Sequence, residues 1–354
     1  MKPMKSPASV GMRRFICCAA LFFLAAAGRA RVFASPQQAA PQAPSPNGTT
    51  TTQHQLSDEA RNLVLQLPKL NDGVVYSIPP SDADPRLKRF VANDLVLFKN
   101  DVANNADLLV FFPPTGGTPA NSWPFMEAAA KAGYRVIGLE YDNATSVPQT
   151  CGKNPDPACS DGFRQKRVFG DDVTKDIDDL PAESIVTRLT KLLEYLNKHH
   201  HDEGWARYLA HGRPKWSSIA VAGHSQGAGM AAYIAKKEKV ARVIVLSGAW
   251  DRTEATKEWA PWVTSPSATP LDRWYAAYHQ KETRADAMKL AYAALKIPPD
   301  HIRIMTLEPR LGSGMNPRAD LYHGSMDSPR LTPIDVNGNP AYAADWAFLL
   351  GSPK

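Results

Sequence analysis

The sequence predicts an α/β fold in which a mostly parallel central sheet is covered by helices on both faces. Two observations lead to this expectation. Short, wholly apolar runs such as 108–112 (LLVFF) alternate with stretches whose apolar residues recur at helical spacing, such as 185–197. A wholly apolar strand is typical of a sheet buried on both faces, and strands that alternate with helices are typical of parallel strands joined by helical crossovers.

The expected elements follow one another in the order that such a sheet needs. Apolar runs predict strands at 108–112, 134–141, 219–222, 241–246, 273–279 and 301–307. Helical spacing or helix-tolerant composition predicts helices at 122–132, 185–197, 228–232 and 284–295. Residues 142–181 interrupt this pattern, so we expect them to form an insertion.

Residues 1–34 are typical of a secretory signal peptide. Basic residues precede a thirteen-residue apolar run at 15–27, and residues 32–34 (VFA) resemble a small-residue cleavage site. An uncleaved N-terminal anchor is the alternative. Residues 35–55 are rich in Pro, Gln, Ala, Ser and Thr, which predicts a disordered linker. The remainder, 56–354, suits one α/β domain.

The positive charge of the chain is concentrated in this leader. Six of the 41 Lys and Arg residues lie within residues 1–34, which contain none of the 35 Asp and Glu residues. The rest of the chain therefore has 35 residues of each sign and no formal net charge. A neutral domain gives no electrostatic reason to expect a nucleic acid or an anionic membrane as partner.

One short motif joins a predicted strand to a predicted helix. The run 219–222 (IAVA) ends at Gly223-His224-Ser225-Gln226-Gly227, and small residues follow. A serine on such a tight turn has strained backbone angles and an exposed hydroxyl, and glycines on either side permit close backbone approach. The helix N-terminus supplies N–H groups for a developing oxyanion. A serine that only caps an ordinary helix is the alternative.

The Gly-His-Ser-Gln-Gly motif in this setting resembles the nucleophile elbow of the α/β-hydrolase superfamily. The resemblance extends over residues 107–346 and assigns no subfamily. It implies the α/β-hydrolase fold, with Ser225 as nucleophile. It also implies that an acid and then a histidine follow the serine along the chain, each after the C-terminal end of a strand.

Three histidines follow the elbow, and His323 fits the catalytic position best. His301 opens the last predicted strand and so lies at its wrong end. His279 ends the strand after which the acid is expected. His323 follows the last strand in a loop, which is the position that the superfamily's chain order requires.

Two carboxylates compete for the role of the acid. Glu282 follows the strand that ends at His279, which is the usual place. Asp251 follows the preceding strand, a position that some members of the superfamily use, and Asp286 is a third and more distant candidate. We favour Glu282. A carboxylate in this role holds the histidine in one tautomer and stabilises its cation.

An oxyanion hole needs two backbone donors. The resemblance places one at Gln226, directly after the serine, and the other at Thr115, in the loop after the first strand. Gly116 is the alternative second donor. Families of this kind often have His-Gly in that loop, whereas this chain has Pro113-Pro114.

Other residues are assigned structural roles. Cys151 and Cys159 flank a Pro-rich segment, and in an exported chain they predict a local disulfide and not a metal site. The basic run 164–167 (RQKR) and the histidines 199–201 are predicted to be solvated. Four tryptophans near strand ends are predicted either to line a substrate pocket or to pack in the core: Trp250, Trp259, Trp262 and Trp274.

These expectations together describe an exported serine hydrolase that cleaves a small carboxylic ester through an acyl-enzyme intermediate, in the periplasm or outside the cell. The mechanism calls for no cofactor and no metal. A serine peptidase or acyltransferase on the same residues is the first alternative. A non-catalytic binding protein on a hydrolase scaffold is the second, because fold does not guarantee activity. The sequence does not predict the oligomeric state.

Overall fold

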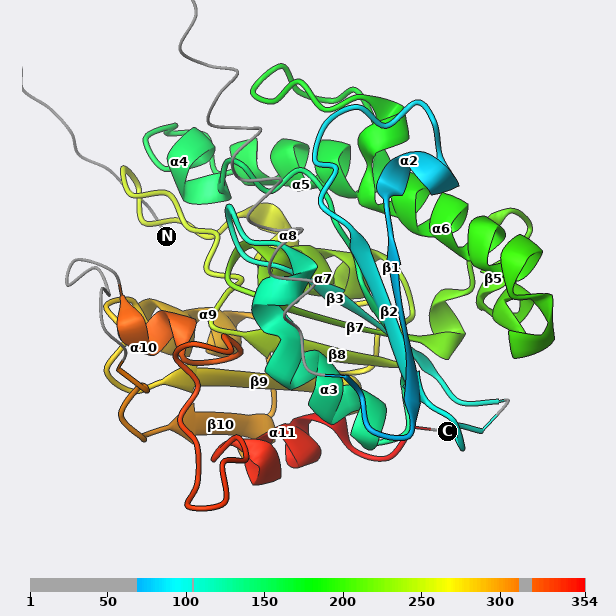
Figure 1. The fold of residues 1–354 in the computed structure, drawn as a ribbon. Coiled ribbons are helices and arrows are strands. Elements are labelled where there is room, and N and C mark those ends of the chain that lie inside the picture. The colour runs from blue at the N-terminus through cyan, green and yellow to red at the C-terminus, as the bar shows by residue number, and fades with distance from the viewer. Residues whose placement is uncertain (1–68, 104, 312–319, 354) are drawn as a thin grey trace, which may run out of the picture. The chain divides into compact units, whose positions relative to one another are not determined.

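The computed structural model describes residues 69–103, 105–311 and 320–353. The expected signal peptide 1–34 and linker 35–55 lie outside these residues, and both stay predictions. The described residues form an eight-stranded sheet with helices on both faces (Figure 1). Within this part of the chain, no helix has the length and apolar character needed to cross a bilayer.

The strand order is β1-β2-β4-β3-β7-β8-β9-β10. Strands β1 (Gly73–Ile78) and β2 (Asp94–Lys99) are antiparallel to their neighbours. The other six are parallel: β3 (Leu108–Phe112), β4 (Arg135–Gly138), β7 (Ile219–His224), β8 (Arg242–Leu246), β9 (Trp274–His279) and β10 (Ile302–Met305). The chain proceeds from β3 outward to β4 and then returns to β7 on the other side of β3. This is the α/β-hydrolase fold, and the predicted fold class is confirmed.

All six predicted strands are present within a few residues of their expected ends, and so are four predicted helices: α3 (Trp123–Lys131), α6 (Ile185–His199), α7 (Gln226–Lys237) and α9 (Ala285–Ala294). The sequence reading missed β1 and β2. Strand β1 is only partly buried along most of its length, whereas β2 carries a buried apolar run at 95–98. The sequence analysis also missed the shorter helices: α2 (Pro80–Ala83), α8 (Pro261–Thr264), α10 (Leu321–Gly324) and α11 (Ala343–Leu350).

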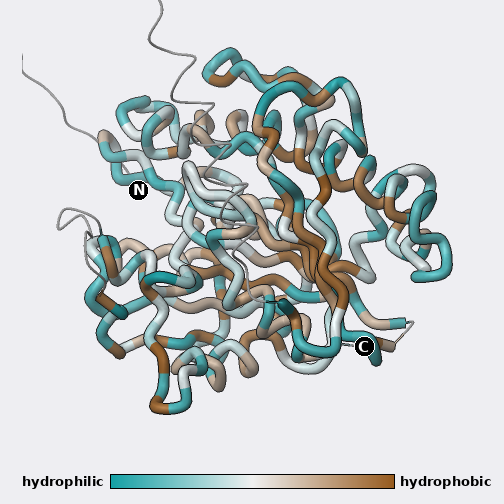
Figure 2. The backbone as a smooth tube through the Cα atoms, in the orientation of Figure 1, coloured by the Kyte–Doolittle hydropathy of each residue, from teal (hydrophilic) through white to brown (hydrophobic). Residues whose placement is uncertain are grey.

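The core has two layers, one on each face of the sheet. In β3, residues Leu108, Val110 and Phe112 pack into one layer, and Leu109 and Phe111 pack into the other. Helices α5 (Cys159–Phe169), α6, α7 and α9 cover the first layer, and α3 and α11 cover the second (Figure 1). The central strands carry the most hydrophobic stretches of the backbone, as Figure 2 shows. A sheet covered on both faces explains why its parallel strands are apolar throughout.

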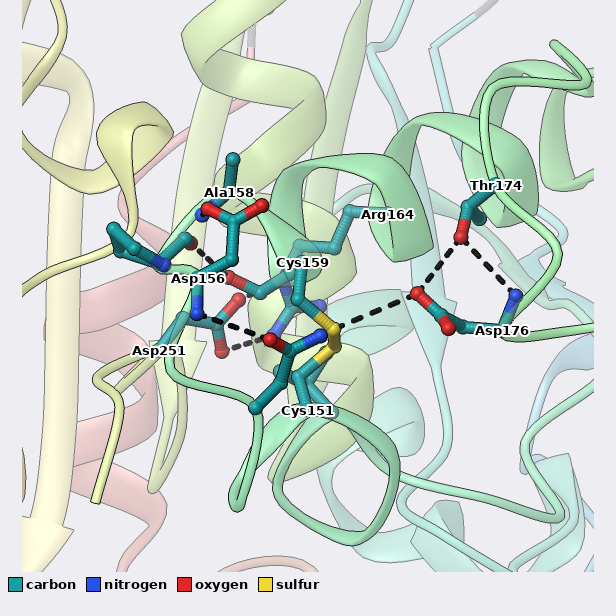
Figure 3. The surroundings of a disulfide bond; sticks show 12 residues. Cys151, Asp156, Ala158, Cys159, Arg164, Thr174, Asp176 and Asp251 are labelled. Atoms are coloured by element: carbon teal, nitrogen blue, oxygen red, sulfur yellow. Dashed lines mark hydrogen bonds and ion pairs between the residues drawn. A yellow bond between two sulfur atoms is a disulfide. The ribbon is translucent and has the colours of Figure 1, made fainter. Parts of the chain in front are cut away.

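The predicted insertion contains two helices, α4 (Val147–Cys151) and α5 (Cys159–Phe169). The predicted disulfide is confirmed: Cys151 ends α4 and bonds to Cys159, which begins α5 (Figure 3). Helix α5 packs against α6 and α7, so the insertion is part of one helical layer. The disulfide therefore holds together the turn that leads into this layer.

The basic run in α5 is not solvated, and that prediction was wrong. Arg164 and Arg167 are each 2% exposed. Arg164 donates to both carboxylate oxygens of Asp251, with an Nη2–Oδ1 distance of 2.7 Å (Figure 3). Arg167 donates in the same two-pronged manner to Asp179. Burial of these cations is possible because each meets a carboxylate from elsewhere in the chain, which local sequence does not reveal.

The start of β2 carries a buried acid. The carboxylate of Asp94 accepts a hydrogen bond of 2.7 Å from the backbone N–H of Glu140, just beyond β4. Burial raises the pKa of Asp94 to about 7, against the lowering effects of this hydrogen bond and of Arg188. The group is therefore protonated in the folded chain at pH values where it is ionised in the unfolded chain.

This difference predicts a pH-dependent stability. Between about pH 4 and pH 7 the folded state binds more protons than the unfolded state, so the free energy of unfolding falls as pH rises through that window. Asp94→Asn keeps the acceptor oxygen but does not ionise, so we expect its stability curve to be flatter there. Urea unfolding at a series of pH values measures this. The exposed Asp300→Asn is the control, and parallel curves for Asp94→Asn and the wild-type protein would contradict the prediction.

Candidate active site

Ser225 lies in the turn between β7 and α7, with φ 55° and ψ −114°. Positive φ is a strained conformation for a residue with a side chain, and it is the conformation that a nucleophile elbow requires. The Ser225 N–H donates to the carbonyl of Leu246, at the end of β8, over 2.9 Å. The serine is therefore held at the carboxyl edge of the sheet and at the N-terminus of α7, where backbone N–H groups point outward.

The glycines of the motif permit close backbone packing. A Cβ atom on Gly227 would lie 2.0 Å from the carbonyl oxygen of Phe112 and 2.7 Å from that of Pro113. A Cβ atom on Gly223 would lie 2.3 Å from the carbonyl carbon of Gly227. The first turn of α7 thus rests directly on the loop that follows β3. This contact brings together the two segments expected to supply the oxyanion donors.

Gly227→Ala is therefore expected to disrupt this contact. Its methyl group meets rigid backbone, so we expect a loss of about 1–3 kcal/mol in the free energy of unfolding and a larger relative loss of any ester-cleaving activity. Gly162→Ala is the control: Gly162 also lies in a helix, α5, but its added Cβ would come no closer than 3.3 Å to another residue, the side chain of Thr174. Denaturant unfolding and steady-state kinetics measure both effects. Equal behaviour of the two variants would contradict the prediction.

Glu282 and His323 are joined by a short hydrogen bond. Glu282 Oε2 lies 2.6 Å from His323 Nδ1. The other carboxylate oxygen accepts from Ser247 Oγ and from the His279 N–H, each over 2.6 Å. The side chain of Glu282 is fully buried, whereas that of His323 is 24% exposed. A fixed carboxylate on Nδ1 leaves the other nitrogen of His323, Nε2, to face a reacting group.

His323 lies in the short helix α10 and not in an irregular loop as predicted. Asp320 caps this helix: its carboxylate accepts from the His323 N–H over 3.1 Å and from the Thr283 N–H over 2.8 Å. Burial acts to raise the pKa of Asp320, but these amide donors outweigh it and hold the pKa below its usual value. The cap therefore ties the histidine helix to the residue next to Glu282.

Asp251, the alternative acid, has other partners. It receives two hydrogen bonds from Arg164 and one of 2.9 Å from the indole Nε1 of Trp262. Its side chain is 3% exposed. Asp251 therefore joins α5 to the loop after β8, and the structure brings Glu282, not Asp251, to His323.

The two expected oxyanion donors lie on segments that pack against each other. Among the described residues, neither the Thr115 N–H nor the Gln226 N–H has a hydrogen-bond acceptor. The N–H of Gly116, the alternative donor, is occupied by the carbonyl of Asn143 over 3.0 Å. Tyr141 Oη also donates to the carbonyl of Pro113 over 2.9 Å, which holds this loop in place. Of these two candidates for the second oxyanion donor, Thr115 is thus the one whose N–H stays available.

The structure brings the segment of Ser225 next to His323 without a direct hydrogen bond between the two side chains in the described residues. The link is His224, whose ring centroid lies 4.5 Å from that of His323. Catalytic hydrogen bonds are often long without substrate and shorten when it binds. The arrangement is therefore an elbow with a neighbouring imidazole and its carboxylate.

The tryptophans divide between the core and the site. Trp262 and Trp274 are buried in the core, at 1% and 0% exposure. Trp250 is partly buried, and its ring lies 6.2 Å from the His323 ring. A small cleft beside it is lined by α4 residues, including Val147, whose N–H donates to the side chain of Gln226 over 3.3 Å. Cys151 of the disulfide borders this cleft, and its lining includes none of Ser225, Glu282 and His323. A larger hollow of about 660 Å³ lies elsewhere, along α5, α6 and α7, and includes none of the expected site residues.

Solved structures of esterases resemble this one in fold. An esterase from Pyrobaculum calidifontis has 15% sequence identity and a TM-score of 0.40, over 87% of this chain and 95% of the other. An esterase from Thermogutta terrifontis has 13% identity and a TM-score of 0.35, over 68% and 83%. A bacterial heroin esterase has 14% identity and a TM-score of 0.37, over 70% and 79%.

No protein-family model and no curated protein sequence matches this chain. The structural likenesses have low TM-scores as well as low identity. The assignment of the α/β-hydrolase fold therefore depends on the strand order and on the strained serine between β7 and α7.

The sequence reading missed residues that position the expected site. Ser247 and Asp320 hold Glu282 and the histidine helix, and His224 and Asp327 form a buried pair next to His323. His224 lies inside the motif, so its position carried a signal. The other three are polar residues in loops or at a helix end, and only their contacts distinguish them.

Proposed function

We propose that the protein is a serine hydrolase that cleaves small carboxylic esters. The observation that carries this proposal is the combination of a strained serine at a helix N-terminus with the Glu282–His323 pair beside it. The carboxylate orients the imidazole, and the helix end provides donors for negative charge. The family resemblance of the motif supports the same conclusion.

In the proposed reaction, Ser225 Oγ attacks the ester carbonyl carbon while His323 Nε2 accepts the serine proton. The N–H groups of Gln226 and Thr115 stabilise the oxyanion, each by about 3 kcal/mol. The carbon–oxygen bond to the alcohol then breaks, and His323 returns the proton to the departing alkoxide. Water attacks the acyl-enzyme by the same steps, which releases the acid and restores Ser225.

A fluorophosphonate probe tests the nucleophile. We expect it to label the wild-type protein once per chain, at Ser225, and to leave Ser225→Ala unlabelled. A folded wild-type protein that takes up no label would overturn the proposal. Turnover of short-chain esters against matching amides then separates an esterase from a peptidase, because the amide has the poorer leaving group.

We also propose that the chain is exported. The basic start and apolar run of residues 1–34 and the disulfide between Cys151 and Cys159 support this, since disulfides persist in oxidising compartments. Expression of the full chain, followed by mass spectrometry of the mature N-terminus, tests it. A mature protein that keeps Met1 and stays in the cytoplasm would contradict it.

A further inference from the structure

A second imidazole–carboxylate pair lies beside the first. His224 Nδ1 is 3.0 Å from Asp327 Oδ1, and both side chains are 3% exposed. The other carboxylate oxygen of Asp327 accepts a hydrogen bond of 2.6 Å from Ser122 Oγ. The proposed reaction uses none of these three residues.

The pair joins the two halves of the site. His224 ends β7 and directly precedes Ser225, whereas Asp327 lies four residues after His323. One side of the His224 ring meets the carboxylate of Asp327, and the ring also packs against that of His323 at 4.5 Å between centroids and 43° between planes. The elbow and the segment that carries the histidine are thus held together through His224.

Both ionisable side chains of this pair are buried. Burial disfavours the protonated ring, but the carboxylates of Asp327 and Glu282, together with the backbone of His323, outweigh it and raise the pKa of His224. The ring therefore binds a proton more readily than a free imidazole does, and its Nδ1 lies next to the carboxyl group of Asp327. Removing one member of such a pair leaves the other as an uncompensated buried charge.

We propose that His224 and Asp327 are a positioning pair. The pair holds the imidazole of His323 over the elbow, and His224 keeps the negative charge of Asp327 from acting on that imidazole. This inference rests on the proposed function of Ser225 and His323. A reacting imidazole must be held within about 0.5 Å of its productive position. Neither member of the pair needs to touch the substrate.

His224→Gln tests the pair, with hydrolysis of a p-nitrophenyl ester as the assay. We expect the kcat of the folded protein to fall by about 10²-fold because of the misplaced imidazole, while KM changes little. The unpaired carboxylate of Asp327 should also lower the free energy of unfolding, so activity is expressed per folded molecule. The uncompensated carboxylate of Asp327 should also favour protonated His323. The acidic limb of the kcat/KM pH profile should therefore move to higher pH.

Two further variants separate position from charge. In His224→Gln/Asp327→Asn the negative charge is gone, so the acidic limb should return towards that of the wild-type protein while kcat stays low. Asp327→Asn alone keeps the shape of the acid. It should lower kcat without moving the acidic limb of the kcat/KM profile to higher pH. His301→Gln is the control, because His301 contacts the start of β9 at the opposite edge of the sheet and should leave both quantities unchanged.

A readout without turnover keeps this proposal distinct from the proposed function. The Nδ1–H of His323 in its 2.6 Å bond to Glu282 should give a downfield proton resonance, whose pH titration reports the His323 ring. If the wild-type protein is inactive, the proposed function fails, and a titration that His224→Gln shifts still supports the pair. The proposal would be overturned if His224→Gln had the same kcat, the same acidic limb of the pH profile and the same titration as the wild-type protein. A loss of kcat that only follows the folded fraction would also overturn it.

Discussion

Ser225→Ala is expected to lower kcat/KM for a short-chain ester by on the order of 10⁶-fold, the size of loss seen when the nucleophile of such a site is removed. The alanine keeps the backbone position but lacks the oxygen that forms the acyl-enzyme. The substitution removes no hydrogen bond to the side chain of Ser225 described in the structure, and we expect the free energy of unfolding to stay the same or to rise slightly. Steady-state kinetics and denaturant unfolding of the purified variant measure these two quantities.

The double variant Ser225→Ala/His323→Ala provides a stricter test. Residues that act as one unit show strongly non-additive losses, so the double variant should lose little more activity than Ser225→Ala alone. Losses that multiply would show that the two residues act separately, and the proposed mechanism would then be wrong. Residual hydrolysis above the rate in water is expected from the oxyanion donors.

Glu282→Gln has the second largest expected effect, a fall in kcat of on the order of 10⁴-fold, because an amide in place of the acid favours the wrong tautomer of the histidine. Glutamine is nearly isosteric, so the hydrogen bonds from Ser247 and the His279 N–H have the same reach. The assay is single-turnover acylation, which reports the chemical step directly.

Asp251→Asn is the matched comparison, because sequence alone left both acids open. Here we expect a loss of stability of about 3–5 kcal/mol, since Arg164 would stay buried without its counter-charge. The activity of the remaining folded protein should fall far less than in Glu282→Gln. The reverse pattern, a stable but inactive Asp251→Asn, would assign the acid to Asp251.

Parts of the site whose signal is local could be predicted from sequence. The motif around Ser225 predicts a tight turn by itself, because only small residues at positions 223 and 227 fit against the neighbouring backbone. Chain order after the elbow led to His323 and favoured Glu282, and the structure places these two side chains in contact. Whether they perform catalysis is what the variants above test.

Features that depend on distant partners could not be predicted. The run 164–167 looks like a solvated surface, because nothing near it in sequence shows that Arg164 meets Asp251, 87 residues away. Gly116 was the alternative to Thr115 as the second donor, and only the structure shows that its N–H donates to the carbonyl of Asn143.

The sequence by itself determined the fold class, the element order and the strained serine, since these follow from apolar periodicity and from backbone sterics within a few residues. Only the tertiary structure decided which acid meets His323 and which cations are buried, and it alone revealed the pair of His224 with Asp327. The physical reason is that charges and hydrogen bonds at such sites join residues tens to hundreds of positions apart. Their pairing depends on where the folded sheet places each loop.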